Sequence, residues 1–233
     1  MTVMATFQKS LIREKYGIPH DAVITVGGTV GVGKSTFTRA LADLLGFRVS
    51  VEKVDGNPYL ERFYDDFARW SFHLQIYFLA ERFKEQKRMF EYGGGFVQDR
   101  SIYEDTGIFA KMLYEQGRMS EDDYQTYTQL FEAMVMTPYF PHPDLLIYLE
   151  GSFDEIIDRV HERGRPMEQQ TPTQYWQDLF GRYDKWIDSF TACPVLRISI
   201  HEYDILNNSG SVEVVLERAA EKIKQLRAVR RNG

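Results

Sequence analysis

The sequence has only one cysteine, Cys193, in 233 residues, and it has no excess of basic residues. A single cysteine excludes a disulfide within the chain. Its place before Pro194 and an apolar segment predicts a small buried residue rather than a reactive thiol. With 28 basic and 34 acidic residues, the formal net charge is −6. The chain therefore lacks the positive surface that a nucleic-acid backbone requires, and we expect no nucleic-acid partner.

Long hydrophobic runs are lacking as well. No uninterrupted apolar run could span a bilayer, and the first residues, MTVMATFQKSLIREKYG, lack the apolar centre of a signal peptide. These absences predict a cytoplasmic protein without a membrane partner. The length suits one domain, so we expect a single domain over residues 1–233, with flexible ends at 1–19 and 229–233.

Short apolar segments alternate with longer helical patterns along the chain. The expected strands are residues 22–26, 47–51, 96–98, 145–149 and 195–200. The expected helices are residues 36–45, 70–92, 102–115, 121–135, 153–162, 174–189 and 212–229. Phe78, Phe83 and Phe90 fall at helical spacing, so we expect them in the core. Strands that alternate with helices predict an α/β fold with a doubly wound parallel five-stranded sheet and helices on both faces.

Residues 27–36, GGTVGVGKST, contain a phosphate-binding pattern. Gly28 to Ser35 fit G-x-x-x-x-G-K-[ST] between an expected strand and an expected helix. Glycines let backbone N–H groups converge on an anion at a helix N-terminus, Lys34 can reach the β- and γ-phosphates, and the Ser35 hydroxyl can ligate Mg²⁺. The residues expected to bind the nucleotide here are Gly28, Thr29, Val30, Gly31, Val32, Gly33, Lys34, Ser35 and Thr36.

Two acids follow expected strands, Glu52 after 47–51 and Asp99 after 96–98. A carboxylate at the end of a strand beside the phosphate-binding strand lies in the crevice where doubly wound folds bind ligands. The alternative at either position is a solvated loop acid. The Asn-Lys-x-Asp sequence that reads guanine in GTPases is absent, and the chain is too short for the additional modules of a motor or transport ATPase. These exclusions leave a small kinase.

Three segments, VEKVDGNPYLERFY, WSFHLQIYFLAERF and QDRSIYEDTGIFAKMLYE, resemble the deoxynucleoside kinase family, in particular its bacterial deoxyadenosine/deoxycytidine kinases. The resemblance extends over residues 20–205. It implies a P-loop kinase fold with an arginine-rich lid at residues 159–170, and a homodimer built on helices. It also implies ATP and Mg²⁺ as cofactors and transfer of the γ-phosphate of ATP to the 5′-hydroxyl of a deoxynucleoside.

The resemblance assigns catalytic roles to individual residues. Glu52 matches the general base for the 5′-hydroxyl, although Lys53 follows it where most relatives have proline. The sequence from Asp99 to Ser101 matches the family's acid-arginine-serine motif. There, Asp99 helps to hold Mg²⁺, and Arg100 contacts the 5′-oxygen region and orients the base.

Further matches concern the sugar and the lid. Tyr64 and Glu168 match the pair that binds the sugar 3′-hydroxyl. Arg159, Arg163 and Arg165 match the lid arginines that close over ATP and stabilise charge on the transferred phosphoryl group. A solvated basic helix end is the alternative interpretation of the arginines, and a core position is the alternative for Tyr64.

The last matches concern the bases. Gln75 matches the glutamine that reads the base edge, Arg82 and Asp105 match a charged pair beside the base, and Phe109 matches a ring that stacks on it. The segment after the last expected strand matches the family's adenine-binding loop, with Glu202, Tyr203 and Asp204. An aspartate beside the base favours deoxyadenosine and deoxycytidine, because both bases present an amino donor.

Two other functions stay open from the residues alone. A nucleoside-monophosphate kinase would use the same loop and lid, but it needs arginines for an acceptor phosphate where Tyr64 and Gln75 lie. A non-catalytic nucleotide-binding regulator would lack a base, and Glu52 argues against it.

Overall fold

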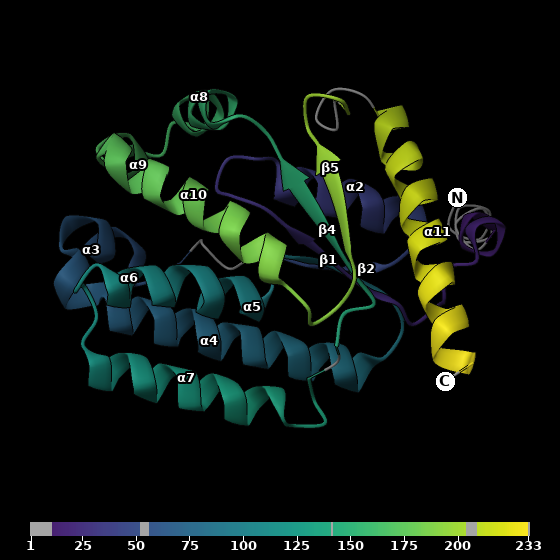
Figure 1. The fold of residues 1–233 in the computed structure, drawn as a ribbon, viewed down its shortest axis with the longest axis horizontal. Helices are drawn as coiled ribbons and strands as arrows, with labels where there is room; N and C mark the ends of the chain where they lie inside the picture. Colours follow the sequence, from purple (N-terminus) through teal and green to yellow (C-terminus); the bar gives the residue numbers. More distant parts are fainter. Residues whose placement is uncertain (1–10, 52–55, 141, 204–208, 233) are drawn as a thin grey trace.

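The structure is a computed structural model that describes residues 11–51, 56–140, 142–203 and 209–232. Its strands form one sheet in the order β2-β3-β1-β4-β5, and all neighbouring strands are parallel (Figure 1). The strands are β1 (Val23–Gly27), β2 (Arg48–Ser50), β3 (Phe96–Asp99), β4 (Leu145–Glu150) and β5 (Val195–Ser199). The predicted doubly wound, parallel, five-stranded sheet is confirmed.

Helices connect the strands. They are α2 (Lys34–Leu45), α3 (Leu60–Asp65), α4 (Phe67–Tyr92), α5 (Ile102–Glu104), the π-helical segment η1 (Asp105–Ala110), α6 (Lys111–Glu115), α7 (Glu121–Val135), α8 (Phe153–Arg163), α9 (Pro166–Gln169), α10 (Thr173–Ser189) and α11 (Ser209–Asn232). The expected boundaries differ from these by no more than three residues. The helix expected at 102–115 is interrupted by η1, and the short helices α3 and α9 were not expected.

Successive side chains of a strand point to opposite sides of the sheet, and helices cover both sides. On one face, Ile24 and Ile147 pack with side chains of α2 and α11. On the other face, Leu146 and Tyr148 pack with η1 and α10, and Val23 packs with Phe96 and α4. Figure 1 shows α11 on one side of the sheet and α4, α6 and α7 on the other.

Polar side chains determine where several long helices begin. Asp66 accepts a hydrogen bond from the backbone of α4, and Ser120 accepts one from the backbone of α7. At the start of α8, Ser152 and Glu155 form a reciprocal capping box. Such a cap stabilises a helix by about 1 kcal/mol. The α8 helix then ends at Gly164, whose φ of 71° lets the chain turn directly into α9.

Some expectations about the ends and the core need correction. Residues 11–16 are helical and Ile18 is buried, so the flexible end expected at 1–19 is wrong for this part; residues 1–10 lie outside the described residues. Phe90 is 50% exposed, because it lies on the outer side of α4, whereas its neighbour Met89 is buried against Val23 and Phe96. Phe78 is partly buried and lines a cavity. Cys193 is buried, as expected. Among the described residues, every helix is too short or too polar to cross a membrane.

Candidate active site

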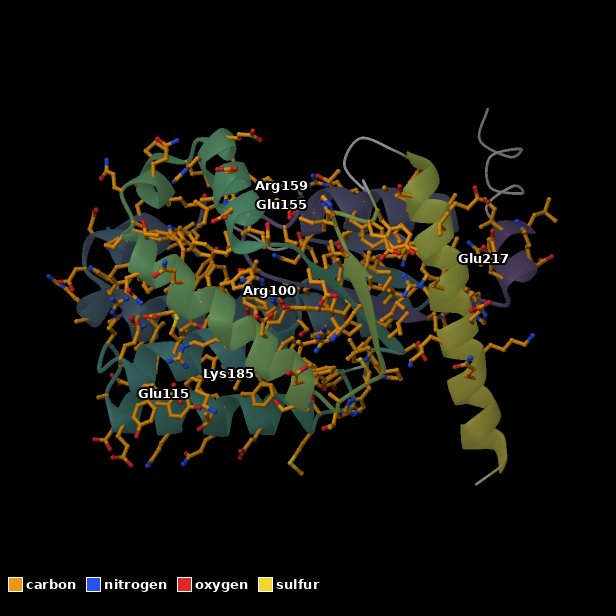
Figure 2. All side chains as sticks on the ribbon, turned by 45° about the horizontal axis from the view of Figure 1, so that its top comes forward. Arg100, Glu115, Glu155, Arg159, Lys185 and Glu217 are labelled. Carbon is orange, nitrogen blue, oxygen red and sulfur yellow. The ribbon has the colours of Figure 1, made fainter. Side chains whose placement is uncertain are left out.

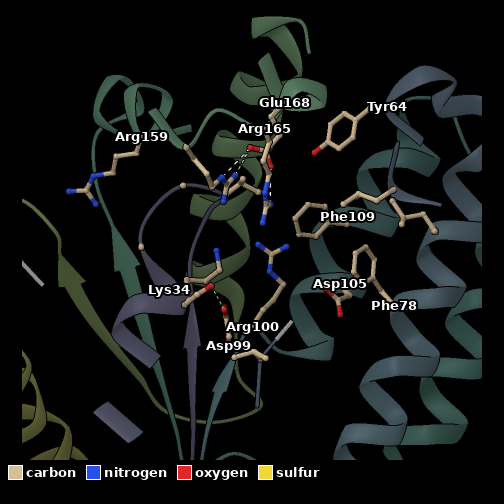
Figure 3. Close-up of a pocket in the computed structure, with 18 of the residues that line it drawn as sticks. Lys34, Tyr64, Phe78, Asp99, Arg100, Asp105, Phe109, Arg159, Arg165 and Glu168 are labelled. Carbon is tan, nitrogen blue, oxygen red and sulfur yellow. Dashed lines mark hydrogen bonds and ion pairs between the residues drawn. The ribbon is translucent and has the colours of Figure 1, made fainter. Parts of the chain in front are cut away.

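A cavity of about 740 Å³ opens at the carboxyl edge of the sheet, between the phosphate-binding loop (residues 28–35), the helices α3 and α4, η1 and the lid (Figure 3). Doubly wound folds bind their ligands at this edge. The predicted site residues that line it are Val30, Gly31, Gly33, Lys34, Ser35, Thr36, Tyr64, Gln75, Asp99, Arg100, Asp105, Phe109, Arg159, Arg163, Arg165 and Glu168. Residues up to 138 positions apart are thus brought together, as the family resemblance implied.

Other predicted residues lie elsewhere. Those that do not line the cavity are Gly28, Thr29, Val32, Arg82, Glu202 and Tyr203. The Tyr203 hydroxyl accepts a hydrogen bond from Nη1 of Arg218 in α11 at 3.0 Å, so this part of the expected adenine loop packs on a helix. The predicted base Glu52 and the predicted loop residue Asp204 lie outside the described residues. Val51, the residue before Glu52, does line the cavity.

The phosphate-binding loop is held closely by its neighbours. Gly28 has a φ of 137°, and a Cβ there would lie 2.5 Å from the carbonyl oxygen of Leu149 at the end of β4. A Cβ on Gly31 would lie 2.7 Å from a methyl carbon of Val160 in α8. Lys34 is buried, and its Nζ donates to the carbonyl oxygens of Gly28 and Thr29, both at 2.8 Å. Glycine is therefore required here both by conformation and by space.

A hydroxyl and a carboxylate meet beside this loop. Val26 of β1 pairs with Asp99 of β3, and the Ser35 hydroxyl donates to Oδ2 of Asp99. Asp99 is buried, and its Oδ1 has no hydrogen-bond partner among the described residues. A free carboxylate oxygen and a hydroxyl form an oxygen donor set of the kind that Mg²⁺ prefers, with the remaining positions left for phosphate and water. The residues present therefore fit Mg²⁺.

Arg100 lies at the centre of the site. It is buried in the middle of the molecule, whereas Arg159 lies on α8 (Figure 2). Its φ of 64° is uncommon for a side-chain-bearing residue, and its N–H donates to the Val26 carbonyl at 2.9 Å. Its guanidinium carbon lies 4.7 Å from the ring centre of Phe109. Figure 3 shows Arg100 between Lys34 on one side and Phe109 and Asp105 on the other.

A buried ion pair fixes Asp105. Nε of Arg82 donates to Oδ2 of Asp105 at 2.9 Å, and Nη1 of Arg82 donates to the Asp99 carbonyl oxygen at 3.0 Å. Arg82 thus holds two site residues from behind, although we expected it beside the base. Gln75 is buried and lines the cavity, and its Oε1 has no hydrogen-bond partner among the described residues. A buried amide oxygen of this kind is suited to a ligand donor.

In the segment expected to form the lid, one acid pairs with two arginines. Oε2 of Glu168 accepts hydrogen bonds from Nη2 and Nε of Arg163 at 2.6 and 3.2 Å, and its Oε1 accepts one from Nη1 of Arg165 at 3.3 Å (Figure 3). Burial raises the pKa of the nearby Tyr64 well above its usual value, and Tyr175 and Glu168 add to the shift. The Tyr64 hydroxyl therefore stays neutral and able to donate a hydrogen bond.

Several contributors to the site were not predicted. Tyr175 lines the cavity and stacks on Phe67, with ring centres 5.4 Å apart; the guanidinium of Arg118 lies 4.2 Å from the other ring, that of Phe67. Phe78 was assigned to the core, although its position three residues after Gln75 puts both on one face of α4. Glu104, directly before Asp105, is fully buried under the phosphate-binding loop. No spacing rule singles out Tyr175 or Glu104.

Comparison with known proteins identifies the family. The sequence profile described as "Deoxynucleoside kinase" matches residues 24–224. The chain belongs to the deoxynucleoside kinase family. This kinase is therefore a phosphotransferase that acts on a nucleoside hydroxyl. It is 63% identical over 210 residues to a deoxyadenosine/deoxycytidine kinase of Bacillus subtilis (strain 168), covering 90% of this chain and 97% of the relative.

The chain is also similar to more distant members of the family in sequence and in structure. The kinase is 35% identical over 211 residues to a deoxyguanosine kinase of Lactobacillus acidophilus, covering 88% of this chain and 92% of the relative. The structure of a deoxyadenosine kinase from M. mycoides with bound dATP superposes with a TM-score of 0.73 at 30% identity, covering 84% of this chain and 98% of that chain. The P-loop kinase fold implied by the resemblance is confirmed.

We expect Glu168→Gln to loosen the lid without unfolding the kinase. The amide keeps the size of the side chain but loses the charge that holds Arg163 and Arg165, which costs about 1–2 kcal/mol. Amide hydrogen exchange in residues 163–168 should then become about 5- to 30-fold faster. Glu162→Gln is the control, because Glu162 also lines the cavity but shows no ion pair among the described residues. Equal exchange in both variants would contradict the interpretation.

Proposed function

We propose that this kinase transfers the γ-phosphate of ATP to the 5′-hydroxyl of deoxyadenosine and deoxycytidine, which supplies monophosphates for salvage of DNA precursors. The observation that carries the proposal is a single cavity that joins the phosphate-binding loop with Lys34 to Gln75 and Asp105, with Arg100 between them. The name of the B. subtilis relative supports the choice of these two nucleosides.

The loop side of the cavity suits the phosphates of ATP. Backbone N–H groups at the N-terminus of α2 favour an anion. The hydrogen bonds that Lys34 makes to two loop carbonyls would be exchanged for bonds to phosphate oxygens. Ser35 and Asp99 are the residues that would hold Mg²⁺. When bound, the ion would supply neutralisation of the charge that develops on the phosphate oxygens.

The other side suits the nucleoside. Tyr64 and Glu168 would bind the sugar 3′-hydroxyl, Gln75 and Asp105 would read the base edge, and Phe109 would stack on the base. In our proposal Glu52 accepts the proton of the 5′-hydroxyl as the hydroxyl oxygen attacks the γ-phosphorus in line. The bond between the γ-phosphorus and the β–γ bridging oxygen breaks, and ADP leaves. Positioning and stabilisation of charge account for most of the rate in such transfers.

The lid would act on the transferred group. Arg163 and Arg165 now pair with Glu168, and both line the cavity. We propose that they turn to the phosphates of bound ATP, where they would stabilise negative charge that is largest in the transition state. A 3′-hydroxyl that donates to Glu168 would then replace part of what this acid loses.

A nucleoside-monophosphate kinase is the less suitable alternative. The acceptor end of the cavity carries Leu74, Gln75, Phe78 and the acid Asp105 among its described lining residues. An acid in an ion pair at that place favours an uncharged acceptor over one that carries a phosphate.

We further propose that residues 1–233 act in the cytoplasm as one kinase domain, with residues 159–170 as the lid, and that two copies associate through α4 and α7. Large apolar side chains are exposed on and after these helices: Phe90 (50%), Tyr92 (62%), Leu130 (40%), Met136 (87%) and Tyr139 (40%). Phe90 and Tyr139 are in contact, with ring centres 5.4 Å apart. Apolar clusters of this kind mark interaction surfaces.

Replacing Glu52 by Gln should lower kcat by about 10²–10⁴-fold, the usual share of a general base, and leave nucleoside binding intact. A coupled assay that follows the release of ADP measures kcat, and calorimetric titration with deoxycytidine measures nucleoside binding. Glu61→Gln, at a site on α3 that is exposed to solvent, makes the same chemical change away from the reaction. Near-normal turnover of Glu52→Gln would remove Glu52 from this role.

Thymidine should be a poor substrate. Asp105 accepts hydrogen bonds from the amino groups of cytosine and adenine, whereas thymine presents a carbonyl, at a cost of about 1–3 kcal/mol or about 5–150-fold in kcat/KM. Arg82→Met with Asp105→Ala should improve thymidine use relative to deoxycytidine. Both members must change, because either one alone would stay buried without its partner. Equal kcat/KM values for thymidine and deoxycytidine in the unmodified kinase would show that Asp105 does not select the base.

Charges on α7 and directly after it should separate the dimer. Leu130→Glu combined with Met136→Glu places two like charges in each half of the proposed contact, so sedimentation should change from dimer to monomer. Val214→Glu is the matched control, since Val214 is an exposed apolar residue on α11, on the other side of the sheet (Figure 1). A dimer that persists in the α7 variant would place the contact elsewhere.

A further inference from the structure

A buried acid that the proposed reaction does not use lies under the phosphate-binding loop. Glu104, the last residue of α5, is fully buried. Its Oε1 accepts hydrogen bonds from the Gly28 N–H at 3.2 Å and from the Tyr183 hydroxyl at 3.3 Å. Its Oε2 accepts one from the Ser101 N–H at 3.0 Å. One carboxylate therefore joins the phosphate-binding loop, the turn between β3 and α5, and α10.

The two backbone donors lie just past the point where β1 and β3 separate. The Arg100 N–H still bonds to the Val26 carbonyl oxygen of β1 at 2.9 Å. Beyond this bond, β1 continues into the phosphate-binding loop at Gly28, and β3 turns into α5 at Ser101. The Glu104 carboxylate thus bridges the two chains where the backbone ladder no longer does.

The surroundings of Glu104 act on its pKa in opposite directions. Burial raises its pKa, while the positive charges of Arg100 and Lys34 and the two backbone N–H groups oppose the shift. Lys34 also donates to the Gly28 carbonyl oxygen at 2.8 Å. Gly28 is therefore fixed at its N–H by Glu104 and at its C=O by Lys34.

We propose that Glu104 is a positioning residue that sets the spacing and orientation of the phosphate-binding loop relative to Arg100. The inference rests on the proposed reaction, in which the loop holds the donor phosphates, and on the contact of Arg100 with the 5′-oxygen region that the family resemblance implies. In-line transfer needs both in register, and a displacement of about 1 Å can cost about 100-fold in rate. Binding of either substrate alone does not need that register, so Glu104 acts on kcat rather than on KM.

The test is Glu104→Gln in the full chain. The amide keeps the size, but its NH₂ group cannot accept, so one of the two backbone N–H groups faces another donor. We expect kcat to fall about 10- to 100-fold, with the KM values for ATP and deoxycytidine changed less than about 3-fold. Glu85→Gln makes the same change at a buried glutamate of α4 that pairs with Arg88, and its kinetics should match the unmodified kinase. Unchanged kcat in folded Glu104→Gln, or KM values that rise as kcat falls, would overturn the proposal.

A second readout separates positioning from a general loss of structure. If Glu104 acts by placing Arg100, its removal should matter less once Arg100 is altered. In an Arg100→Lys background, Glu104→Gln should lower kcat less than about 3-fold, well below its effect alone. Full additivity of the two changes would contradict the proposed route through Arg100.

Tyr183→Phe decides the question if Glu104→Gln does not fold. It removes only one of the three donors that orient the carboxylate. We expect kcat to fall about 2- to 5-fold at constant KM, and unchanged kcat would overturn the proposal. All variants are compared with the unmodified kinase. Absence of activity in the unmodified chain would refute the proposed reaction itself, whereas normal activity with unaffected variants would refute only the role of Glu104.

Discussion

The pairing of Val26 in β1 with Asp99 in β3 is the constraint on which the site depends. Parallel pairing ends both strands at the same edge, so the phosphate-binding loop leaves β1 beside the acid that ends β3. Ser35 can then donate to Asp99, and the Arg100 N–H can reach β1. A slip of one residue would turn every side chain of β3 to the opposite face. The register that buries the core therefore also assembles the site.

Fixed carboxylates hold the cations of this site in place. Asp105 holds Arg82 inside the protein, and Glu168 holds Arg163 and Arg165 in the lid. Because a buried acid is costly without a partner, each arginine that turns to a phosphate must be replaced by another donor. The acids thus pre-order the cations, and in the proposed reaction they would also make donor and acceptor binding depend on each other.

Much of the fold could be predicted because buried strands and helices carry apolar residues in a recognisable pattern along the sequence. Strand β4 reads as one apolar run since both faces of the sheet are covered, and the start of α7 is marked by its cap, Ser120. The phosphate-binding loop follows from spacing alone. The inner side of the site could not be predicted: the family resemblance pairs Arg82 with Asp105 but does not say whether Arg82 faces the ligand or supports Asp105 from the protein interior. Phe90 was misassigned because it lies on the outer side of α4, although Met89 directly before it is buried in the core.

The π-helical segment η1 shows why residues 102–115 could not be read as one regular helix. A π-turn holds more residues than an α-turn, so it rotates the side chains that follow, and such turns are rare and frequent at functional sites. Part of the packing here comes from α10: a Cβ on Gly107 would lie 2.6 Å from Nε1 of Trp186. With that close approach, Ile108 is buried while Asp105 and Phe109 line the cavity. The direction of Asp105 and Phe109 therefore depends on contacts with two other helices, with α4 through Arg82 and with α10 through Trp186, and no local pattern in the sequence records these contacts.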